Sequence, residues 1–148
     1  MAETAARIGY GTLLEYSDGA SPPNWTTLAE VTNLSGPGLS KDVPDASHMT
    51  SPDGYREFIS GLKDGGEVTA ECNFLPEHVT HGNVTGILAM FENDALARDW
   101  HIIWPGASPR VTWQFKAVVS GAEPADPVDD KMTLSVTLKV SGKPDFTG

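Results

Sequence analysis

Residues 132–140 read MTLSVTLKV, and apolar and polar side chains alternate through the whole stretch. This period of two predicts a β-strand with one buried face and one polar face. The side chains expected to point inward are Met132, Leu134, Val136, Leu138 and Val140. Those expected to point outward are Thr133, Ser135, Thr137 and Lys139.

The run at residues 111–120 alternates in the same way, with Val118 as the single exception. Its apolar side holds Val111, Trp113, Phe115, Ala117 and Val119, and its polar side holds Thr112, Gln114, Lys116 and Ser120. The acidic, proline-bearing segment GAEPADPVDD at residues 121–130 joins the two runs. Together they predict an antiparallel hairpin with an extended tip that carries Asp126, Asp129 and Asp130.

Residues 67–75 predict a third strand, with Val68, Ala70, Cys72 and Phe74 inward and Thr69, Glu71 and Asn73 outward. Shorter strands are expected at residues 11–16, 26–31 and 100–104. One helix is expected where Val84, Ile87, Leu88 and Phe91 recur at helical spacing, capped by Thr80 or Asn83. The fold class is therefore α+β and mainly β, an antiparallel sandwich or small barrel with one flanking helix.

A chain of 148 residues predicts one domain that spans residues 1–148. Twenty acids against ten bases give a net charge of −10, which opposes binding to nucleic-acid phosphates. The single cysteine, Cys72, excludes an internal disulfide framework and favours a reducing compartment. No apolar run approaches a membrane span, and residues 1–7 lack the apolar core of a secretory signal. We expect the whole chain to be made and folded in the cytoplasm.

Three segments lack a core pattern of their own. Residues 36–54 are rich in glycine and proline, and a loop of that length in a compact domain is usually functional or disordered. Residues 1–7 and 142–148 are expected to be free arms. The loop is predicted to stack against another subunit, and its candidate contacts are Leu39, Ser40, Lys41, Asp42, Val43, His48 and Met49.

Candidate chemical sites are weak. Glu77, His78 and His81 resemble a metal cluster, but structural zinc sites bring three or four converging ligands, so turn histidines are favoured. The sequence holds no nucleophile elbow, phosphate-binding loop or dinucleotide fingerprint, so no enzyme activity and no cofactor are expected. Trp25, Trp100 and Trp104 leave one alternative open, a carbohydrate-binding β-sandwich of a phage fibre or secreted protein.

A family resemblance runs through the first half of the chain. It is carried by GTLLEYSDG at residues 11–19, WTTLAEVTNL at 25–34, SGPG at 35–38, SPDGYREFI at 51–59 and SGLKDGGEV at 60–68. These segments resemble the major tail tube protein of long, non-contractile phage tails and of gene transfer agents. The resemblance extends to the helix and the C-terminal hairpin. Some relatives carry a further C-terminal immunoglobulin-like domain, which we do not expect in this chain.

The resemblance implies a β-sandwich-like fold, related to the tubes of type VI secretion, and a structural function. Six subunits would form a ring, and rings would stack into a tube that conducts DNA. The implied partners are other copies of the chain, a tape-measure protein, a tail terminator and distal tail or baseplate proteins. Double-stranded DNA would pass without specific binding. In such a tube the polar strand faces would line the lumen, with candidates Thr69, Glu71, Asn73, Thr112, Gln114, Lys116, Thr133, Ser135 and Thr137.

Overall fold

The two long strands pair as the antiparallel hairpin that the alternation predicts. The computed structural model describes residues 3–106 and 109–146, and places β8 at Thr112–Ala125 and β9 at Thr133–Asp145. Leu134, Val136 and Leu138 are fully buried, which confirms the inward face of residues 132–140. Met132 lies just before β9 and is exposed, so its assignment to the core was wrong. The hairpin is also longer than expected, because pairing continues to Ala125 and Thr133.

Seven strands form one antiparallel sheet in the order β2-β1-β7-β8-β9-β6-β3. The other five strands are β1 Leu13–Ser17, β2 Trp25–Thr27, β3 Val31–Ser35, β6 Glu67–Asn73 and β7 Arg98–Ile103. The single strand expected at residues 26–31 is two strands, because the chain turns at Glu30, which has a φ of 51°. A separate two-stranded ribbon pairs β4 Ser40–Lys41 with β5 Lys63–Asp64.

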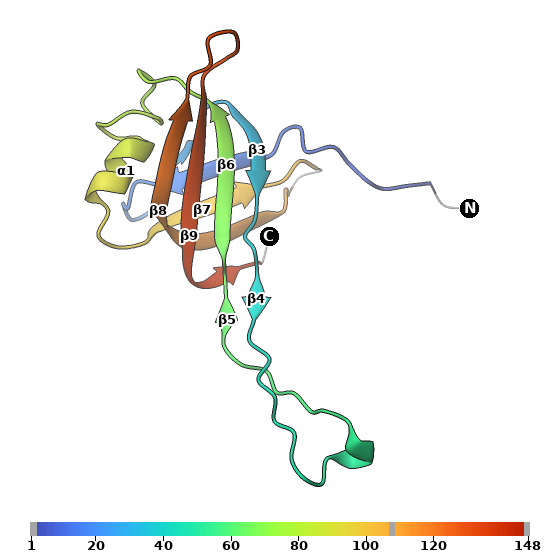
Figure 1. Cartoon of the computed structure of the whole chain (residues 1–148). Helices are drawn as coiled ribbons and strands as arrows, with labels where there is room; N and C mark the ends of the chain where they lie inside the picture. Colours follow the sequence, from blue (N-terminus) through green and yellow to red (C-terminus); the bar gives the residue numbers. More distant parts are fainter. Residues whose placement is uncertain (1–2, 107–108, 147–148) are drawn as a thin grey trace.

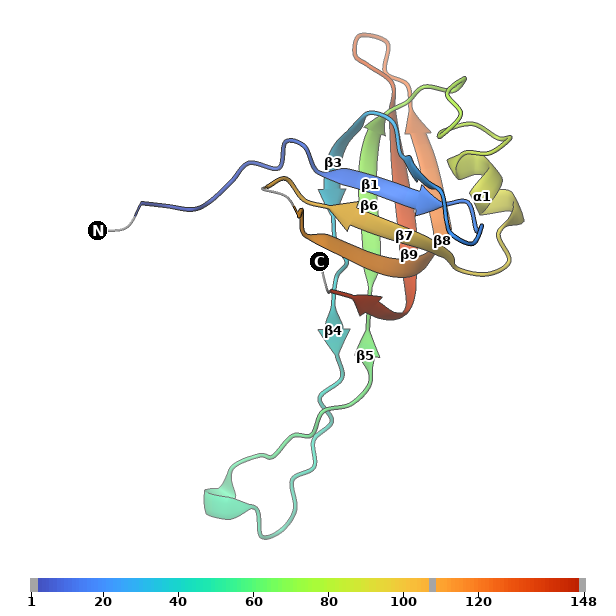
Figure 2. The ribbon, with the colours of Figure 1, turned by 180° about the vertical axis from the view of Figure 1, so that it is seen from behind.

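The sheet folds over on itself and encloses the core. Strands β1 and β7 cross in front of β3, β6 and β9 (Figure 2). The long strand β8 belongs to both halves, and its register shifts twice, between Gln114 and Lys116 and between Val119 and Gly121. Bulges of this kind bend a strand and increase its twist. The core between the halves includes Leu14, Trp100, Ile102, Val68, Val136 and Leu138.

The helix begins later than its sequence pattern predicts. Helix α1 spans Ile87–Asn93 with Gly86 at its N-cap, so neither Thr80 nor Asn83 caps it. Its buried residues are Ile87, Ala89 and Met90, whereas Val84 and Phe91 are exposed. A turn precedes the helix, in which the Ile87 amide donates to the Thr80 carbonyl at 3.0 Å. A side chain at Gly86 would meet Thr80 backbone atoms, so the helix starts only after this tight segment.

The two expected arms differ. From Glu3 the chain runs to the body as an extended segment without strand pairing, tied by a hydrogen bond from Arg7 Nη1 to the Pro105 carbonyl at 3.1 Å (Figure 1). Residues 142–145 belong to β9 and Asp145 pairs with Gln114, so a free arm there was wrong. Residues 1–2 and 147–148 lie outside the described part of the chain. Within the described residues, no helix is long and apolar enough to cross a membrane.

Candidate functional surfaces

Residues 36–66 project from one end of the body as a long hairpin (Figure 1). Its base continues strands β3 and β6 through two glycines with positive φ, Gly36 at 97° and Gly66 at 71°. A side chain at Gly66 would overlap the carbonyl of Gly38 on the facing segment between β3 and β4. The strands therefore approach too closely here for any residue but glycine, and this approach sets the direction of the projection.

The far end of this projection has hydrogen bonds of its own. Glu57 accepts from the Ser51 hydroxyl at 2.7 Å and lies 3.2 Å from His48 Nε2. Its backbone amide donates to Ser47 Oγ at 2.7 Å, and Asp45 bridges to Phe58. These contacts give the far end a defined conformation. It also carries exposed apolar side chains. They are Met49, Tyr55, Phe58 and Ile59.

The predicted loop contacts all lie on this projection and are exposed, namely Leu39, Ser40, Lys41, Asp42, Val43, His48 and Met49. The loop boundary at residue 54 was too early, because the return strand runs to Gly66. Tyr55, Phe58 and Ile59 were therefore missed as candidates. Apolar side chains are most often buried, so the sequence did not distinguish these three from core residues.

The β8–β9 tip lies at the end opposite the projecting hairpin (Figure 1). Residues 121–125 are paired strand rather than loop, so the tip is shorter than predicted and begins at Asp126. Asp126, Asp129 and Asp130 are exposed, and Val128 between them is fully exposed. In residues 3–106 and 109–146 no ion pair involves these three aspartates.

Six of the nine predicted lumen residues share one face of β6 and β9. Thr69 pairs with Thr137, Glu71 with Ser135 and Asn73 with Thr133. Directly opposed residues of antiparallel strands point to the same side, and the intervening residues of both strands are buried. The face is polar and reaches solvent. Within it, Asn73 donates a hydrogen bond to the Glu30 carboxylate at 3.1 Å.

Thr112, Gln114 and Lys116 lie elsewhere. They belong to the part of β8 that pairs with β7, where Thr112 opposes Ile103 and Gln114 opposes His101. This part of β8 lies in the other half of the folded sheet, across the core from β6 (Figure 2). The structure therefore does not bring these three residues together with the other six, because the bends of β8 separate them.

The histidines of residues 77–81 form hydrogen bonds that stabilise the turn. His81 is buried, accepts from the Leu75 amide at Nδ1 and contacts the Ala29 carbonyl through Nε2 at 3.0 Å. Burial lowers the pKa of His81, against the opposing effect of the Ala29 hydrogen bond. Burial also raises the pKa of Cys72 to about 11. Across the described residues, no group of three or more His, Cys, Asp and Glu side chains could hold a metal ion.

The three tryptophans pack against neighbouring side chains. Trp100 is fully buried in the core, and Trp104 packs edge-on against Trp113 with ring centroids 4.8 Å apart. Trp25 stacks on His101 at 3.9 Å. The observation behind the carbohydrate-binding alternative, three tryptophans outside the longest strands, is accounted for by packing.

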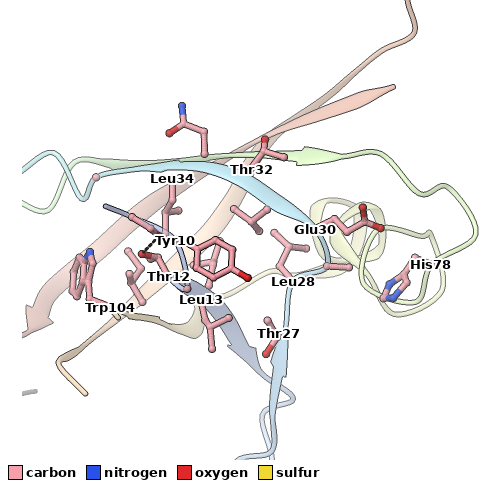
Figure 3. Close-up of a pocket in the computed structure, with 18 residues that line it drawn as sticks. Tyr10, Thr12, Leu13, Thr27, Leu28, Glu30, Thr32, Leu34, His78 and Trp104 are labelled. Atoms are coloured by element: carbon pink, nitrogen blue, oxygen red, sulfur yellow. Dashed lines mark hydrogen bonds between the residues drawn. The ribbon is translucent and has the colours of Figure 1, made fainter. Parts of the chain in front are cut away.

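A groove of about 960 Å³ opens between the first strands and β3 (Figure 3). Tyr10, Leu13 and Trp104 line one side, and Leu34 and Thr32 line the other. Strands β2 and β3 are the two ends of the seven-stranded order, so the groove is the seam where the folded sheet does not close. Within the described part of the chain, β3 pairs on one edge alone, with β6.

A family model described as lambda phage tail tube protein matches residues 7–147. The chain belongs to this tail tube protein family. As a family member it is a structural subunit of a tail tube. The match includes the projection, the polar face of β6 and β9 and the β8–β9 tip, the three exposed surfaces described above.

Solved structures share the fold of this tail tube protein at low sequence identity. The tail of an empty gene transfer agent particle, refined with C6 symmetry, matches with a TM-score of 0.75 at 14% identity, covering 97% of this chain and all of that one. The tube-terminating cap of the anti-feeding prophage gives 0.69 at 13% identity, with 95% and 90% covered. The SPP1 tail tube gives 0.63 at 12% identity, with 91% and 75% covered. No match was found among curated proteins.

Proposed function

We propose that this tail tube protein forms rings of six copies that stack into a hollow conduit for double-stranded DNA, a number supported by the C6 symmetry of the similar tail. The observation that carries this proposal is the β6–β9 face. Its side chains are polar and exposed or half-buried, and among the described residues their one side-chain hydrogen bond joins Asn73 to Glu30, while the opposite face of the same strands is buried. A channel filled with water and DNA gives this face a function.

Unpaired strand edges support closure into a ring. Strand β3 has one partner strand, and β8 beyond Ala117 pairs with β9 alone among the described residues. The half-sheet β3-β6-β9-β8 therefore carries free backbone groups on both sides. Free edges are templates for pairing with another chain. Joining one edge to the other edge of the next copy is a head-to-tail contact, and such contacts form a ring when the rotation between copies closes.

The lumen is proposed to be lined by Thr69, Glu71, Asn73, Thr133, Ser135 and Thr137. Hydroxyl and amide groups bind water, and the Glu71 carboxylate repels phosphate, so DNA passes without being held. Gln114 and its neighbours on β8 are left out, since they face away from the other half of the sheet. The projection at 36–66 and the β8–β9 tip are proposed to join successive rings.

The partners follow from this position in a tail. We expect contacts with a tape-measure protein inside the tube, with a terminator at one end, and with distal tail or baseplate proteins at the other. The fold similarity to a chain in the structure of a tube-terminating cap supports a terminator among the partners. The subunit is expected to have no enzyme activity, to be made in the cytoplasm of the bacterial host and to enter a particle tail there.

Electron microscopy of the purified chain at high concentration tests this function. Tubes with a central channel and six-fold end views are expected. Replacing residues 44–60 with Asn-Gly keeps the ribbon pairing of Asp42 with Gly61 and Leu62. This variant should stay folded by circular dichroism and form no tubes. A wild-type chain that stays monomeric at all concentrations, or tubes of normal length from the shortened variant, would contradict the proposal.

A further inference from the structure

Two lysines face each other across the ribbon at the base of the projection. Lys41 of β4 is directly opposite Lys63 of β5. Like charges at directly opposed positions destabilise a strand pair. Neither lysine forms an ion pair with any residue in 3–106 or 109–146. The isolated chain therefore keeps two adjacent positive charges together without a compensating acid.

The rest of the ribbon shows that this arrangement is local. Strand side chains alternate, so Ser40 and Asp64 point to the face opposite the two lysines. On that face Asp64 is compensated, since its carboxylate lies 3.2 Å from Lys139 Nζ. In a chain with twice as many acids as bases, an uncompensated lysine pair marks a place where an anion from outside the chain binds favourably.

An acidic segment lies at the other end of the same molecule. Residues 123–131 hold Glu123, Asp126, Asp129 and Asp130 against Lys131. The tip also exposes Val128, and Leu39 and Val43 are exposed two positions either side of Lys41. The two surfaces thus carry opposite charges, and each places apolar side chains beside those charges. These apolar side chains are exposed to water in a single copy.

The fold places these surfaces so that copies can follow one another. The tip and the projection leave opposite ends of the body, and the β4–β5 ribbon is the part of the projection nearest the body (Figure 1). When a second copy follows in the same orientation, its tip approaches the end from which the ribbon of the first copy leaves. A contact between different surfaces of identical copies repeats without limit along such a line.

We propose that Lys41 and Lys63 of one copy bind the acidic tip of a second copy, through Asp126 and Asp129. This contact rests on the proposed stacking of rings and assigns residues to it. The partner is another copy of this chain. The bond is electrostatic, and salt screens surface charge pairs. The minimum concentration for tube formation should therefore rise with ionic strength.

Charge reversal on each side, and on both sides together, tests the contact. Lys41→Glu with Lys63→Glu, and Asp126→Lys with Asp129→Lys, should each abolish sedimentable tubes while the melting temperature stays within a few degrees of wild type. The variant carrying all four changes keeps the net charge of wild type and should recover tubes. Glu92→Lys, on the exposed side of α1, is the control for a charge change elsewhere and should form tubes normally.

The outcomes separate this contact from the proposed function. If wild type forms tubes and either reversed pair does so equally well, the contact is wrong and the tube function stands. Loss of tubes in both pairs without recovery in the combined variant also overturns the contact, since the two surfaces then act on different partners. If wild type forms no tubes, the proposed function fails and the contact fails with it.

Discussion

Lys139 of β9 forms an ion pair with Asp64 of β5, with Nζ 3.2 Å from Oδ1. The two residues are 75 positions apart in the chain, and the pair attaches the base of the projection to the longest hairpin of the sheet. The Val140 amide donates to the Gly66 carbonyl at 3.0 Å beside it. The orientation of the projection thus depends on β9.

Removing this ion pair should affect assembly more than stability. Both side chains are about half exposed, and exposed pairs contribute under about 1 kcal/mol to the free energy of unfolding. Lys139→Ala should therefore melt close to wild type but need a higher protein concentration to form tubes. Lys116→Ala, which breaks the exposed pair with Asp99 at 3.8 Å, is the control. Equal assembly by both variants would mean that the tether is dispensable.

Gly66→Ala should destabilise the fold. Gly66 has a φ of 71°, and a side chain there would overlap the Gly38 carbonyl. Strained backbone of this kind costs about 1–3 kcal/mol, before any shift of the facing strand. Gly38→Ala is a close control, because a Cβ at Gly38 would meet nothing within 4 Å. Urea unfolding should separate the two variants, and equal midpoints would contradict the close approach.

Acid should weaken the fold through His81. Burial lowers the pKa of His81 from the usual 6.5, so the folded chain binds this proton less readily than the unfolded chain. The free energy of unfolding should therefore fall as the pH drops below about 6.5. His81→Gln should be less stable at pH 7 and should lose part of this pH dependence. His48→Gln, on the exposed projection, is the control for losing a histidine outside the core. Thermal melts between pH 7.5 and 5 measure both, and parallel curves for wild type and His81→Gln would refute the assignment.

A basic lumen should slow DNA passage. Glu71→Lys with Ser135→Lys places two lysines at directly opposed positions of the proposed channel face. Lysines add contacts to DNA phosphates, so tubes should form while DNA transfer from assembled particles falls severalfold. Gln114→Lys, on the other half of the sheet, is the control and should transfer normally. Transfer at the wild-type rate through tubes of the double variant would show that this face does not line the channel.

The alternation in the sequence predicted the inner faces of β6 and β9 well. Val68, Ala70 and Cys72, like Leu134, Val136 and Leu138, are all buried, because a strand with one covered face must alternate. The alternation did not predict the bulge between Val119 and Gly121. It depends on how β8 bends to join both halves, and so the sequence could not show that Gln114 and Glu71 lie on different surfaces.

The helix and the projection show the same limit. Val84 has the helical spacing of a core residue, yet it is exposed. The helix begins only after Gly86, so Val84 lies in the turn before it. Phe58 and Ile59 resemble a buried strand, but they lie far from the core on the projection. The sequence pattern alone does not distinguish exposed hydrophobic residues such as these from core residues. Their surroundings become evident only when the fold places them.

The register of β6 with β9 has a mechanical consequence. Their pairing runs from Glu67–Lys139 to Asn73–Thr133, and both strands lie along the line that joins the tip to the projection. Hydrogen bonds between antiparallel strands are perpendicular to the strands. A pull applied at the two ends of the subunit therefore shears all of these bonds together instead of unzipping them one at a time. A tail built from such subunits would therefore resist stretching within each subunit.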